Sequence, residues 1–394
     1  MLLLSINTGS STLKFRLYAM PEEEIIAKGS FERIGSNDSD YTIKYNGDKI
    51  YEQKLMKTHE DAVNILLTTL VDKQIVTSLD DIKAVGHRVV HGGSKYSHSV
   101  IITDEVEKDI NAMKDLAPLH NPAAIKGIEC FKKAIPNATM VACFDTAFHQ
   151  TMDEATYLYP VPYSWYKDYG VRKYGFHGLS HQYITFKMKD ILKDDKNLII
   201  CHIGNGASIS AVRSGKCIDT SMGFTPNAGI MMGTRCGDID YSIIGYIMEK
   251  AHLTYSEVDN LLNKQSGLEG IAAMNDLRDI DEAYLANDKQ VVLAINMYTE
   301  RIAEYIAKYM IKLNHVDAII FTAGGGENDP IIRKETIKKL SSLGLDLDDE
   351  LNEKTVVRKG NEGIITTEKS TIPVYVLGTD EELVIAKDTY SLAK

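Results

Sequence analysis

The stretch from Asn197 to Asp240, NLIICHIGNGASISAVRSGKCIDTSMGFTPNAGIMMGTRCGDID, organises the rest of the chain. Its first apolar run, 198–201, has the length and β-branched character of a buried strand. The strand leads directly into Gly204-Asn205-Gly206, where glycines let the backbone turn tightly and present bare N–H groups to an anion. A second strand over 207–213 ends at Ser214-Gly215, which is typical of a hairpin. The remainder is rich in hydroxyls and glycines, with little that could form a core, and this composition predicts a phosphate site.

Length and composition indicate a globular protein of more than one domain. The chain has 394 residues, with 44% hydrophobic and 25% charged residues, so two domains or more are expected. The net charge of -11 argues against nucleic acid as a partner, because a phosphate backbone needs a basic face. Small anions remain compatible, since they need only a local positive pocket.

The cysteines and the apolar segments point to a cytoplasmic protein. There are five cysteines, an odd number without a C-x-x-C pair, and this fits a reducing compartment. The N-terminal run MLLLSINTGSS reaches glycine at once and has no basic flank, so we expect a strand rather than a signal peptide. No stretch reaches the length of a membrane span, and no membrane partner is expected.

Two further loops of the same kind bracket the central stretch. Asn7-Thr8-Gly9-Ser10-Ser11-Thr12 separates expected strands over 2–6 and 13–18, and residues 323–330, AGGGENDP, follow an expected strand over 318–322. Any one of them could be an ordinary turn. The glycine run 324–326 is expected to leave a flat surface for a nucleotide, with a helix N-terminus after it. Because a hairpin opens at Asn7 and another at Asn205, two similarly folded halves are expected.

The rest of the chain alternates strands and helices. Strands are expected over 40–55, with a turn at Asn46-Gly47, and over 82–90, 139–144 and 372–377. Helices are expected over 59–71, 123–134, 241–262 and 291–313, and from Leu383 onward. In the 291–313 helix, the residues expected toward the core are Ile295, Met297, Ile302, Ile306 and Met310.

Three polar side chains stand where apolar neighbours make them conspicuous. Arg88 lies in an apolar strand, which is costly unless it is paired in a buried ion pair or faces a ligand. Asp145 follows a buried strand, where open α/β sheets place their ligands, although it could instead cap the next turn. His177 lies between Phe176 and Gly178, which indicates an exposed, preorganised side chain, although a lone histidine is usually structural.

Taken in order, eleven motifs resemble those of the acetate kinase family: NTGSSTLKF, GHRVVHGG, LHNP, FDTAFH, YGFHGLSH, CHIGNGAS, DTSMGFTP, MMGTRCGDID, NDLRD, AGGGEN and TDEEL. The resemblance covers nearly the whole chain. It implies an α/β fold of two ribonuclease-H-like (actin-like ATPase) domains with an interdomain active-site cleft. The implied domains are residues 1–150 plus 381–394 and residues 151–380.

The resemblance also implies roles for individual residues. Arg88 would hold the acetate carboxylate, Arg235 and His177 would stabilise the phosphoryl group in transfer, and Asp145 would orient Arg88 and position the metal through water. Mg²⁺, for which Mn²⁺ can substitute, would lie at Asn7 and Glu381. The implied acyl pocket consists of Val90, Leu119, Phe176 and Pro226. The implied nucleotide contacts are Lys14, His202, Ile203, Gly204, Asn205, Gly206, Asp276, Leu277, Arg278, Gly324, Gly325, Gly326, Glu327 and Asn328.

The implied activity is reversible phosphoryl transfer between ATP and acetate in a cytoplasmic homodimer. The alternatives are a propionate or other short-chain acid kinase, a pyrophosphate-linked acetate kinase, and a non-catalytic nucleotide switch of the actin type. A switch would have no reason to carry Arg88, His177 and Arg235. The chain departs from the family's usual residues at Leu179, Asn227-Ala228, Gly325, Cys236, Tyr241 and Asp380, and these departures bear on nucleotide preference, stability and metal affinity.

Overall fold

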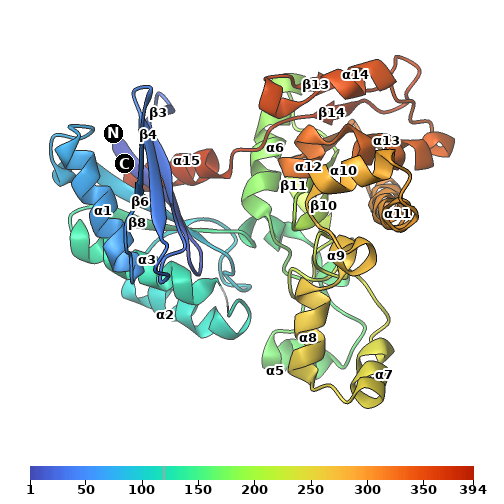
Figure 1. The fold of residues 1–394 in the computed structure, drawn as a ribbon, viewed down its shortest axis with the longest axis horizontal. Coiled ribbons are helices and arrows are strands. Elements are labelled where there is room, and N and C mark those ends of the chain that lie inside the picture. Colours follow the sequence, from blue (N-terminus) through green and yellow to red (C-terminus); the bar gives the residue numbers. More distant parts are fainter. Residues whose placement is uncertain (119) are drawn as a thin grey trace. The chain divides into compact units, whose positions relative to one another are not determined.

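The structure, a computed structural model, describes residues 1–118 and 120–394. Two compact units make up the chain (Figure 1). Unit 1 comprises Met1–Gln150 and Asp380–Lys394, and unit 2 comprises Thr151–Thr379. Each unit is built on one mixed sheet, which confirms the predicted α/β class. Among the described helices, none is long and apolar enough to span a membrane.

Unit 1 holds an eight-stranded sheet in the order β5-β4-β3-β2-β1-β6-β8-β7. Strands β1 to β5 form an antiparallel meander, whereas β6 and β8 run parallel to β1. The strands are β1 (Leu2–Thr8), β2 (Leu13–Ala19), β3 (Glu24–Glu32), β4 (Asp40–Tyr45), β5 (Asp48–Gln53), β6 (Ile82–Val89), β7 (Val100–Ile101) and β8 (Thr139–Phe144). The helices are α1 (His59–Asp72), α2 (Asp104–Ala112), α3 (Asn121–Ala134) and α15 (Glu381–Ala393), with short 3₁₀ turns at Leu79–Asp81, Met113–Asp115 and Ala147–Thr151.

The two faces of this sheet are covered differently. One face packs on α1 and α3 around a core that includes Phe15, Phe31 and Phe131. On the other face, α15 packs on β1, β6 and β8. A Cβ at Gly86 would lie 2.1 Å from Thr389 Oγ1, so glycine in β6 permits this close approach.

Unit 2 holds a six-stranded sheet in the order β11-β10-β9-β12-β14-β13. Its strands are β9 (Leu198–Ile203), β10 (Ala207–Arg213), β11 (Lys216–Thr220), β12 (Ala318–Thr322), β13 (Gly363–Ile364) and β14 (Val374–Val376). Its helices are α4 (Glu154–Tyr157), α5 (Tyr163–Tyr169), α6 (Gly178–Leu192), α7 (Ser242–Ala251), α8 (Tyr255–Lys264), α9 (Gly267–Ala272), α10 (Leu277–Leu285), α11 (Lys289–Leu313), α12 (Ala323–Asn328), α13 (Pro330–Lys339) and α14 (Asp349–Lys354), with 3₁₀ turns at Ser341–Leu343 and Val357–Lys359.

The two sheets share one topology, as the repeated hairpin predicts. The run β3-β2-β1-β6-β8 of unit 1 corresponds to β11-β10-β9-β12-β14 of unit 2. In each run the first three strands are antiparallel neighbours, and the last two run parallel to the central hairpin strand. In both units, parallel strand ends therefore meet at one edge of the sheet, where α/β folds bind ligands.

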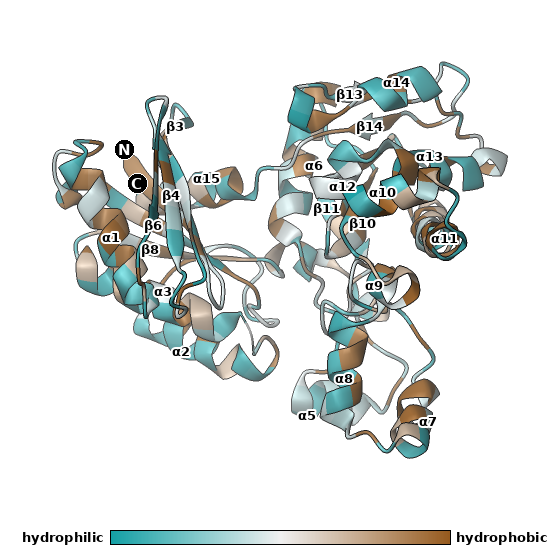
Figure 2. Ribbon diagram, viewed as in Figure 1, coloured by the Kyte–Doolittle hydropathy of each residue, from teal (hydrophilic) through white to brown (hydrophobic). Residues whose placement is uncertain are grey.

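Three expectations about elements were wrong. The helix expected over 241–262 is two helices, because His252 adopts a left-handed conformation (φ 57°) and Thr254 caps α8 with Glu257. The glycine run after β12 is helical, as α12. In α11, Met297 and Met310 are only half-buried, and Tyr298 and Tyr309 take core positions instead. Most of the larger helices carry both brown and teal segments in Figure 2, as expected of helices that bury one side.

Candidate active site

In unit 1, polar side chains gather at the carboxyl ends of the parallel strands. Arg88, near the end of β6, donates from Nε and Nη2 to Asp145 Oδ1 and Oδ2 at 2.9 and 2.7 Å. Its Nη1 lies 3.4 Å from Glu381 Oε2 at the start of α15. The bidentate geometry fixes the plane of the guanidinium. Burial alone would lower the pKa of Arg88, but the charges of Asp145 and Glu381 outweigh burial and raise it.

The metal candidates lie in this same unit. Asn7 is in β1, directly opposite Lys14 in β2, and Glu381 begins α15. Burial raises the pKa of Glu381 against the opposing charge of Arg88. The described residues contain no group of three or more His, Cys, Asp or Glu side chains placed to hold a metal. Asn and Glu oxygens nevertheless suit Mg²⁺, which usually takes one or two protein ligands and completes its shell with water and substrate phosphates.

In unit 2, His177 is held by a chain of hydrogen bonds that runs into the sheet. His177 has a left-handed backbone (φ 58°) immediately before α6, and its Nδ1 lies 2.9 Å from Ser208 Oγ. Ser208 Oγ lies 2.8 Å from His181 Nε2, and His181 Nδ1 lies 2.7 Å from Ser210 Oγ. The His177 ring also stacks on His202 at 4.1 Å. The imidazole is therefore fixed on its Nδ1 side, and its Nε2 lies toward Gly206.

Arg235 and His177 converge on the glycine loop. A Cβ placed on Gly206 would lie 3.3 Å from Arg235 Nη1 and 3.5 Å from His177 Nε2, so both cation-capable groups lie beside the open side of this glycine. Arg235 Nη1 donates to the Pro226 carbonyl at 3.1 Å. No carboxylate of the described residues forms an ion pair with Arg235, and burial lowers the pKa of Arg235.

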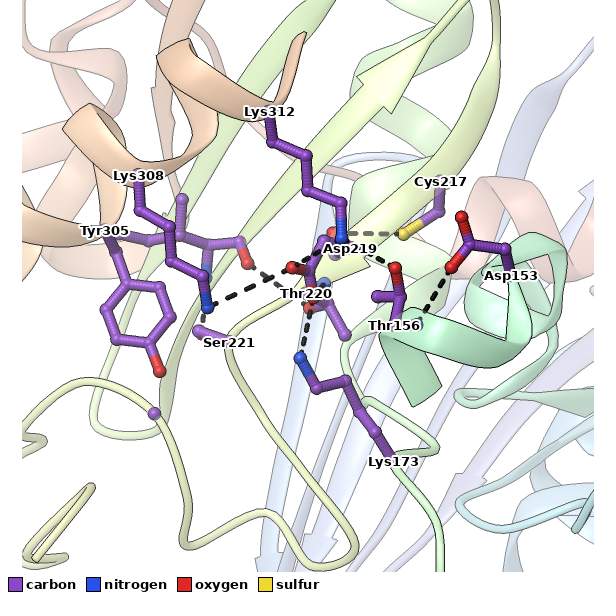
Figure 3. A network of polar contacts seen from close by, with 12 residues as sticks. Asp153, Thr156, Lys173, Cys217, Asp219, Thr220, Ser221, Tyr305, Lys308 and Lys312 are labelled. Carbon is purple, nitrogen blue, oxygen red and sulfur yellow. Dashed lines mark hydrogen bonds and ion pairs between the residues drawn. The ribbon is translucent and has the colours of Figure 1, made fainter. Parts of the chain in front are cut away.

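A buried carboxylate anchors the segment before His177. Asp219, at the end of β11, accepts from Lys173 at 2.7 Å and from Lys312 at 3.1 Å, and Lys308 approaches to 4.0 Å (Figure 3). Burial alone would raise the pKa of Asp219, but the three ammonium charges hold it below its ordinary value. The carbonyl of Gly223 accepts the Tyr174 and Gly175 amides. These contacts hold residues 173–175 against the loop that carries Pro226.

The predicted nucleotide residues of unit 2 meet around a cavity of about 500 Å³. The predicted residues that line it are Gly204, Asn205, Asp276, Leu277, Arg278, Gly324, Gly325 and Asn328. Asp276 caps α10 and pairs with Arg278. Gly206 lies against Arg235, and Ile203 at the end of β9 leads into the loop.

The other predicted nucleotide residues do not line this cavity. Three of them form hydrogen bonds within unit 2. His202 Nδ1 lies 2.8 Å from Ser180 Oγ, and the Gly326 carbonyl accepts from Arg333. Glu327 Oε1 accepts the amides of Ala323 and Thr379, both at 2.9 Å. Lys14 lies in unit 1, exposed on β2.

Seven residues that line the cavity were not predicted: Gly233, Leu268, Asn275, Asp281, Tyr298, Asp329 and Arg358. Asp281 Oδ1 and Asp329 Oδ2 are buried without a hydrogen-bond partner among the described residues. Burial, reinforced by the Asp329 charge, raises the pKa of Asp281 to about 7, and burial raises that of Asp329 to about 6. Nothing in the sequence marked these two acids. An acidic residue in a helical segment such as RDIDE, residues 278–282, is usually exposed to solvent.

The predicted acyl-pocket residues fall in both units. Val90 follows β6 directly and is half-buried, whereas Phe176 is buried and Pro226 half-buried in unit 2. Leu119 lies outside the described residues.

Among the departures from the family pattern, Asp380 caps α15 and pairs with Arg16 at 2.7 Å, so its charge is balanced within unit 1.

Comparisons with known proteins agree on one family. Residues 2–387 match the profile described as the Acetokinase family. The acetate kinase of Halalkalibacterium halodurans is 49% identical over 395 aligned residues, which cover 99% of this chain and 100% of that protein. The crystal structure of Porphyromonas gingivalis acetate kinase superposes with a TM-score of 0.93 at 40% identity and full coverage of both chains. A propionate kinase from Francisella tularensis gives 0.94 at 41% identity, with 99% of each chain covered.

Proposed function

The chain belongs to the acetokinase family, and from this premise we propose that it is an acetate kinase, which transfers a phosphoryl group reversibly between ATP and acetate to give acetyl phosphate and ADP. The observation that carries the proposal is the convergence of Arg235 and His177 on Gly206. The same glycine loop lines the cavity that collects the nucleotide residues. A donor-rich patch thus lies where the terminal phosphate of a nucleotide would end.

The chemistry explains why these groups are needed. Transfer from ATP to a carboxylate brings two anions together, so catalysis consists mostly of alignment and neutralisation of charge. Arg235 and the Nε2–H of His177 would hydrogen-bond to the oxygens of the transferring phosphoryl group. The backbone amides of 204–206 would bind the neighbouring phosphates, and Lys14 would add a further positive charge.

On the acid side, Arg88 would bind the acetate carboxylate. Asp145 and Glu381 hold the guanidinium in one orientation, which lowers the entropy cost of forming the reactive pair. One guanidinium edge is committed to Asp145. Acetate would therefore bind at Nη1 and compete there with Glu381.

Three side chains of unit 1 suit a divalent cation. Asn7 and Glu381 would hold Mg²⁺, for which Mn²⁺ can substitute, and Asp145 would position it through water. The ion, when bound, neutralises charge on the nucleotide phosphates. Both ligands belong to unit 1, so the protein part of this site needs only one unit. We further propose that the two units are the domains 1–150 plus 381–394 and 151–380.

The acyl group would lie against Val90, Phe176, Pro226 and Leu119. Such a pocket separates acids that differ by one methylene by only about 1 to 3 kcal/mol, so propionate is the main competing substrate. The curated relatives at 49% identity are acetate kinases, which favours acetate. A nucleotide switch without catalysis does not account for the arrangement of Arg88, His177 and Arg235.

Trapping the acyl phosphate with hydroxylamine tests the activity directly. Acetate, propionate and butyrate are compared with ATP and Mg²⁺, and acetate should give the highest kcat/KM. Val90→Ala removes two methyl groups and makes room for a longer acyl chain, so the ratio of kcat/KM for propionate over acetate should rise by roughly tenfold, because one methylene is worth about 1 to 3 kcal/mol in such a pocket. Val89→Ala, a buried neighbour in β6, is the control for stability loss alone. A wild-type preference for propionate would overturn the acetate assignment.

The assembly and the compartment are also proposals. We infer a homodimer through α7, in which no residue is buried and Tyr246 and Ile243 are 62% and 46% exposed. Exposed aromatic and aliphatic side chains on one helix usually mark a protein interface. None of the five cysteines forms a disulfide in the structure, which supports a reducing, cytoplasmic location.

A further inference from the structure

One face of the unit 1 sheet carries a row of cations that phosphoryl transfer does not use. Arg16 in β2 pairs directly with Lys28 in β3, Lys28 with Lys44 in β4, and Lys44 with Lys49 in β5. Residues directly opposite one another on antiparallel strands point to the same face. The four side chains therefore form one line across four strands, which we call the cation row.

A second row of polar side chains runs beside the first. Lys14 pairs with Ser30, Ser30 with Thr42, and Thr42 with Tyr51. These residues stand two positions along each strand from the cation row, and so they share its face. The second row thus places three hydroxyls and one more ammonium group next to the cations, and it starts opposite Asn7.

The charge of the cation row is not balanced within the chain. Arg16 is neutralised by Asp380 at 2.7 Å and Glu382 at 3.2 Å. The other cations of the two rows, Lys14, Lys28, Lys44 and Lys49, are all exposed, and none of them forms an ion pair with a described residue. Like charges placed directly opposite one another destabilise a sheet. In a chain of net charge -11, such a concentration of cations indicates a binding role.

The face is open where the row lies. Helix α15 packs on β1, β6 and β8 and contacts β2 at Arg16 and Tyr18, and the strands β3 to β5 extend the sheet beyond it. A groove of about 400 Å³ is lined there by Lys14, Arg16, Lys28, Ser30, Lys44 and Lys49, among others, and by one carboxylate, Glu382, which pairs with Arg16. The opposite side of the same strands buries Phe15, Phe31 and Ile43 in the core, so the strand alternation fixes the lysines toward solvent.

We propose that this groove binds a linear inorganic polyphosphate. Strands lie about 4.8 Å apart, so the cation row runs about 14 Å from β2 to β5. A polyphosphate carries charge on every unit without intervening sugars or bases, which suits an uninterrupted line of ammonium groups with hydroxyl donors beside it. Single-stranded nucleic acid would need several aromatic side chains for base stacking, and the described residues of the two rows include one aromatic, Tyr51.

The test measures binding without nucleotide or acetate, so its outcome is independent of the kinase proposal. The triple variant Lys28→Gln, Lys44→Gln, Lys49→Gln is compared with wild type by calorimetric titration of sodium polyphosphate at several salt concentrations. The variant should bind at least ~10-fold more weakly, and the slope of log K against log salt should fall by about 0.7 to 0.9 for each lysine that contacts a phosphate. Lys57→Gln, Lys73→Gln, Lys83→Gln, at exposed lysines elsewhere in unit 1, is the matched control and should bind like wild type.

Two further measurements identify the ligand and check that the variant folds. Orthophosphate should bind much more weakly than polyphosphate, and oligothymidylate of similar length should also bind more weakly. Equal or tighter oligothymidylate binding would overturn the choice of polyphosphate. Because the variant removes like-charge pairs, it should melt at or above the wild-type temperature. If polyphosphate fails to bind wild type, or binds wild type and the triple variant equally, the proposal is wrong and the lysines serve only to keep the sheet edge from pairing with other chains.

Discussion

At the scale of single residues, the two arginines that we propose act in catalysis differ in what holds them. Arg88 is bound by two carboxylates in unit 1, so its orientation is set before any ligand arrives. Arg235 donates to a carbonyl and lies near the Met232 sulfur, so its full positive charge remains available to an anion. The first arrangement suits a clamp for a weakly bound carboxylate, and the second suits a phosphoryl group that gains charge in the transition state.

This contrast predicts different effects of truncation. Arg235→Ala should lower kcat by more than ~100-fold with little change in melting temperature, since it removes a preorganised donor but breaks no ion pair. Arg88→Ala should lower turnover as much and also lose up to about 3 kcal/mol of stability, because Asp145 stays buried without its partner. Arg213→Ala, at an exposed position of β10, should change neither. Near-normal turnover in Arg235→Ala would remove it from the reacting centre.

The histidine chain predicts a role for Ser208. If Ser210 donates to His181, His181 to Ser208, and Ser208 to His177 Nδ1, the His177 proton lies on Nε2, where it can donate to a phosphoryl oxygen. Ser208→Ala removes the link to His177 and should lower kcat by about 10-fold or more without a large change in KM for ATP. Ser210→Ala, two hydrogen bonds further from His177, should have a smaller effect.

The readout that separates this role from mere packing is the tautomer. Nitrogen-15 NMR of His177 should show the Nε2–H form in wild type and a mixture of forms in Ser208→Ala. Equal kinetics in the two serine variants, or an Nδ1–H tautomer in wild type, would contradict the direction of the chain.

The sequence could predict those site residues that stand out from their immediate neighbours in the chain. Arg88 in an apolar strand and Asp145 after one could be singled out because each violates its surroundings, and the structure places them in contact. Asp281 and Asp329 were missed because their burial arises only when α10, α12 and α13 meet around the cavity. The same is true of Ser208, whose neighbours His177 and His181 lie 31 and 27 residues away.

At the scale of elements, α12 shows how context overrides composition. A run of three glycines has low helix propensity, yet 323–328 is helical because the Glu327 carboxylate accepts the Ala323 amide and the segment packs on Ile203. The break at 252–254, inside the single helix expected over 241–262, could be read from the sequence only in part. Thr254 and Glu257 form a capping box, but the left-handed His252 before it has no sequence signature. Strands were easier, since alternation and buried runs are local properties.

The glycines of α12 make a matched pair for testing this packing. A Cβ on Gly325 would lie 2.7 Å from Leu277 Cδ1 and 3.1 Å from the Ile203 carbonyl, whereas one on Gly324 would meet no atom within 4 Å. Gly324→Ala should therefore stabilise the protein by about 0.5–1 kcal/mol through helix propensity. Gly325→Ala should destabilise it by about 1–3 kcal/mol through overpacking.

Adding Leu277→Ala to Gly325→Ala should recover part of that loss, because it removes the closest clashing atom. Urea unfolding of the four proteins measures these differences. Equal effects of the two glycine substitutions would show that α12 is not packed tightly on α10 and β9.

At the scale of the whole molecule, one buried histidine makes folding sensitive to acid. His87 in β6 is 1% exposed, packs edge-on against Phe131, and has no hydrogen-bond partner for either ring nitrogen among the described residues. Burial lowers the pKa of His87 to about 3. The unfolded chain therefore binds a proton below about pH 6.5 that the folded chain does not. Stability is fully present above that pH and falls, by up to about 1.4 kcal/mol per pH unit, as pH drops toward 3.

Replacing the side chain isolates this contribution. His87→Leu keeps an apolar group of similar size and removes both unpaired nitrogens, so it should match or exceed wild-type stability at pH 7 and gain on wild type as the pH falls toward 5. Urea unfolding at a series of pH values gives the difference. His98→Leu, at an exposed position, should leave the pH dependence unchanged. If the free energy of unfolding of wild type and of His87→Leu changed with pH in the same way, the lowered pKa of His87 would be contradicted.

Assembly is tested on the exposed helix α7. If a second copy of the chain covers Tyr246 and Ile243, light scattering should give twice the chain mass of 43.9 kDa. Tyr246→Glu and Ile243→Glu would each bury an unpaired carboxylate in that interface, which is strongly unfavourable, and should shift the mass toward that of one chain at micromolar concentration. Ile311→Glu is the matched control, because Ile311 is 83% exposed on α11 and should leave the dimer intact. A wild-type mass of one chain, or dissociation by Ile311→Glu and not by the α7 variants, would move the interface away from α7.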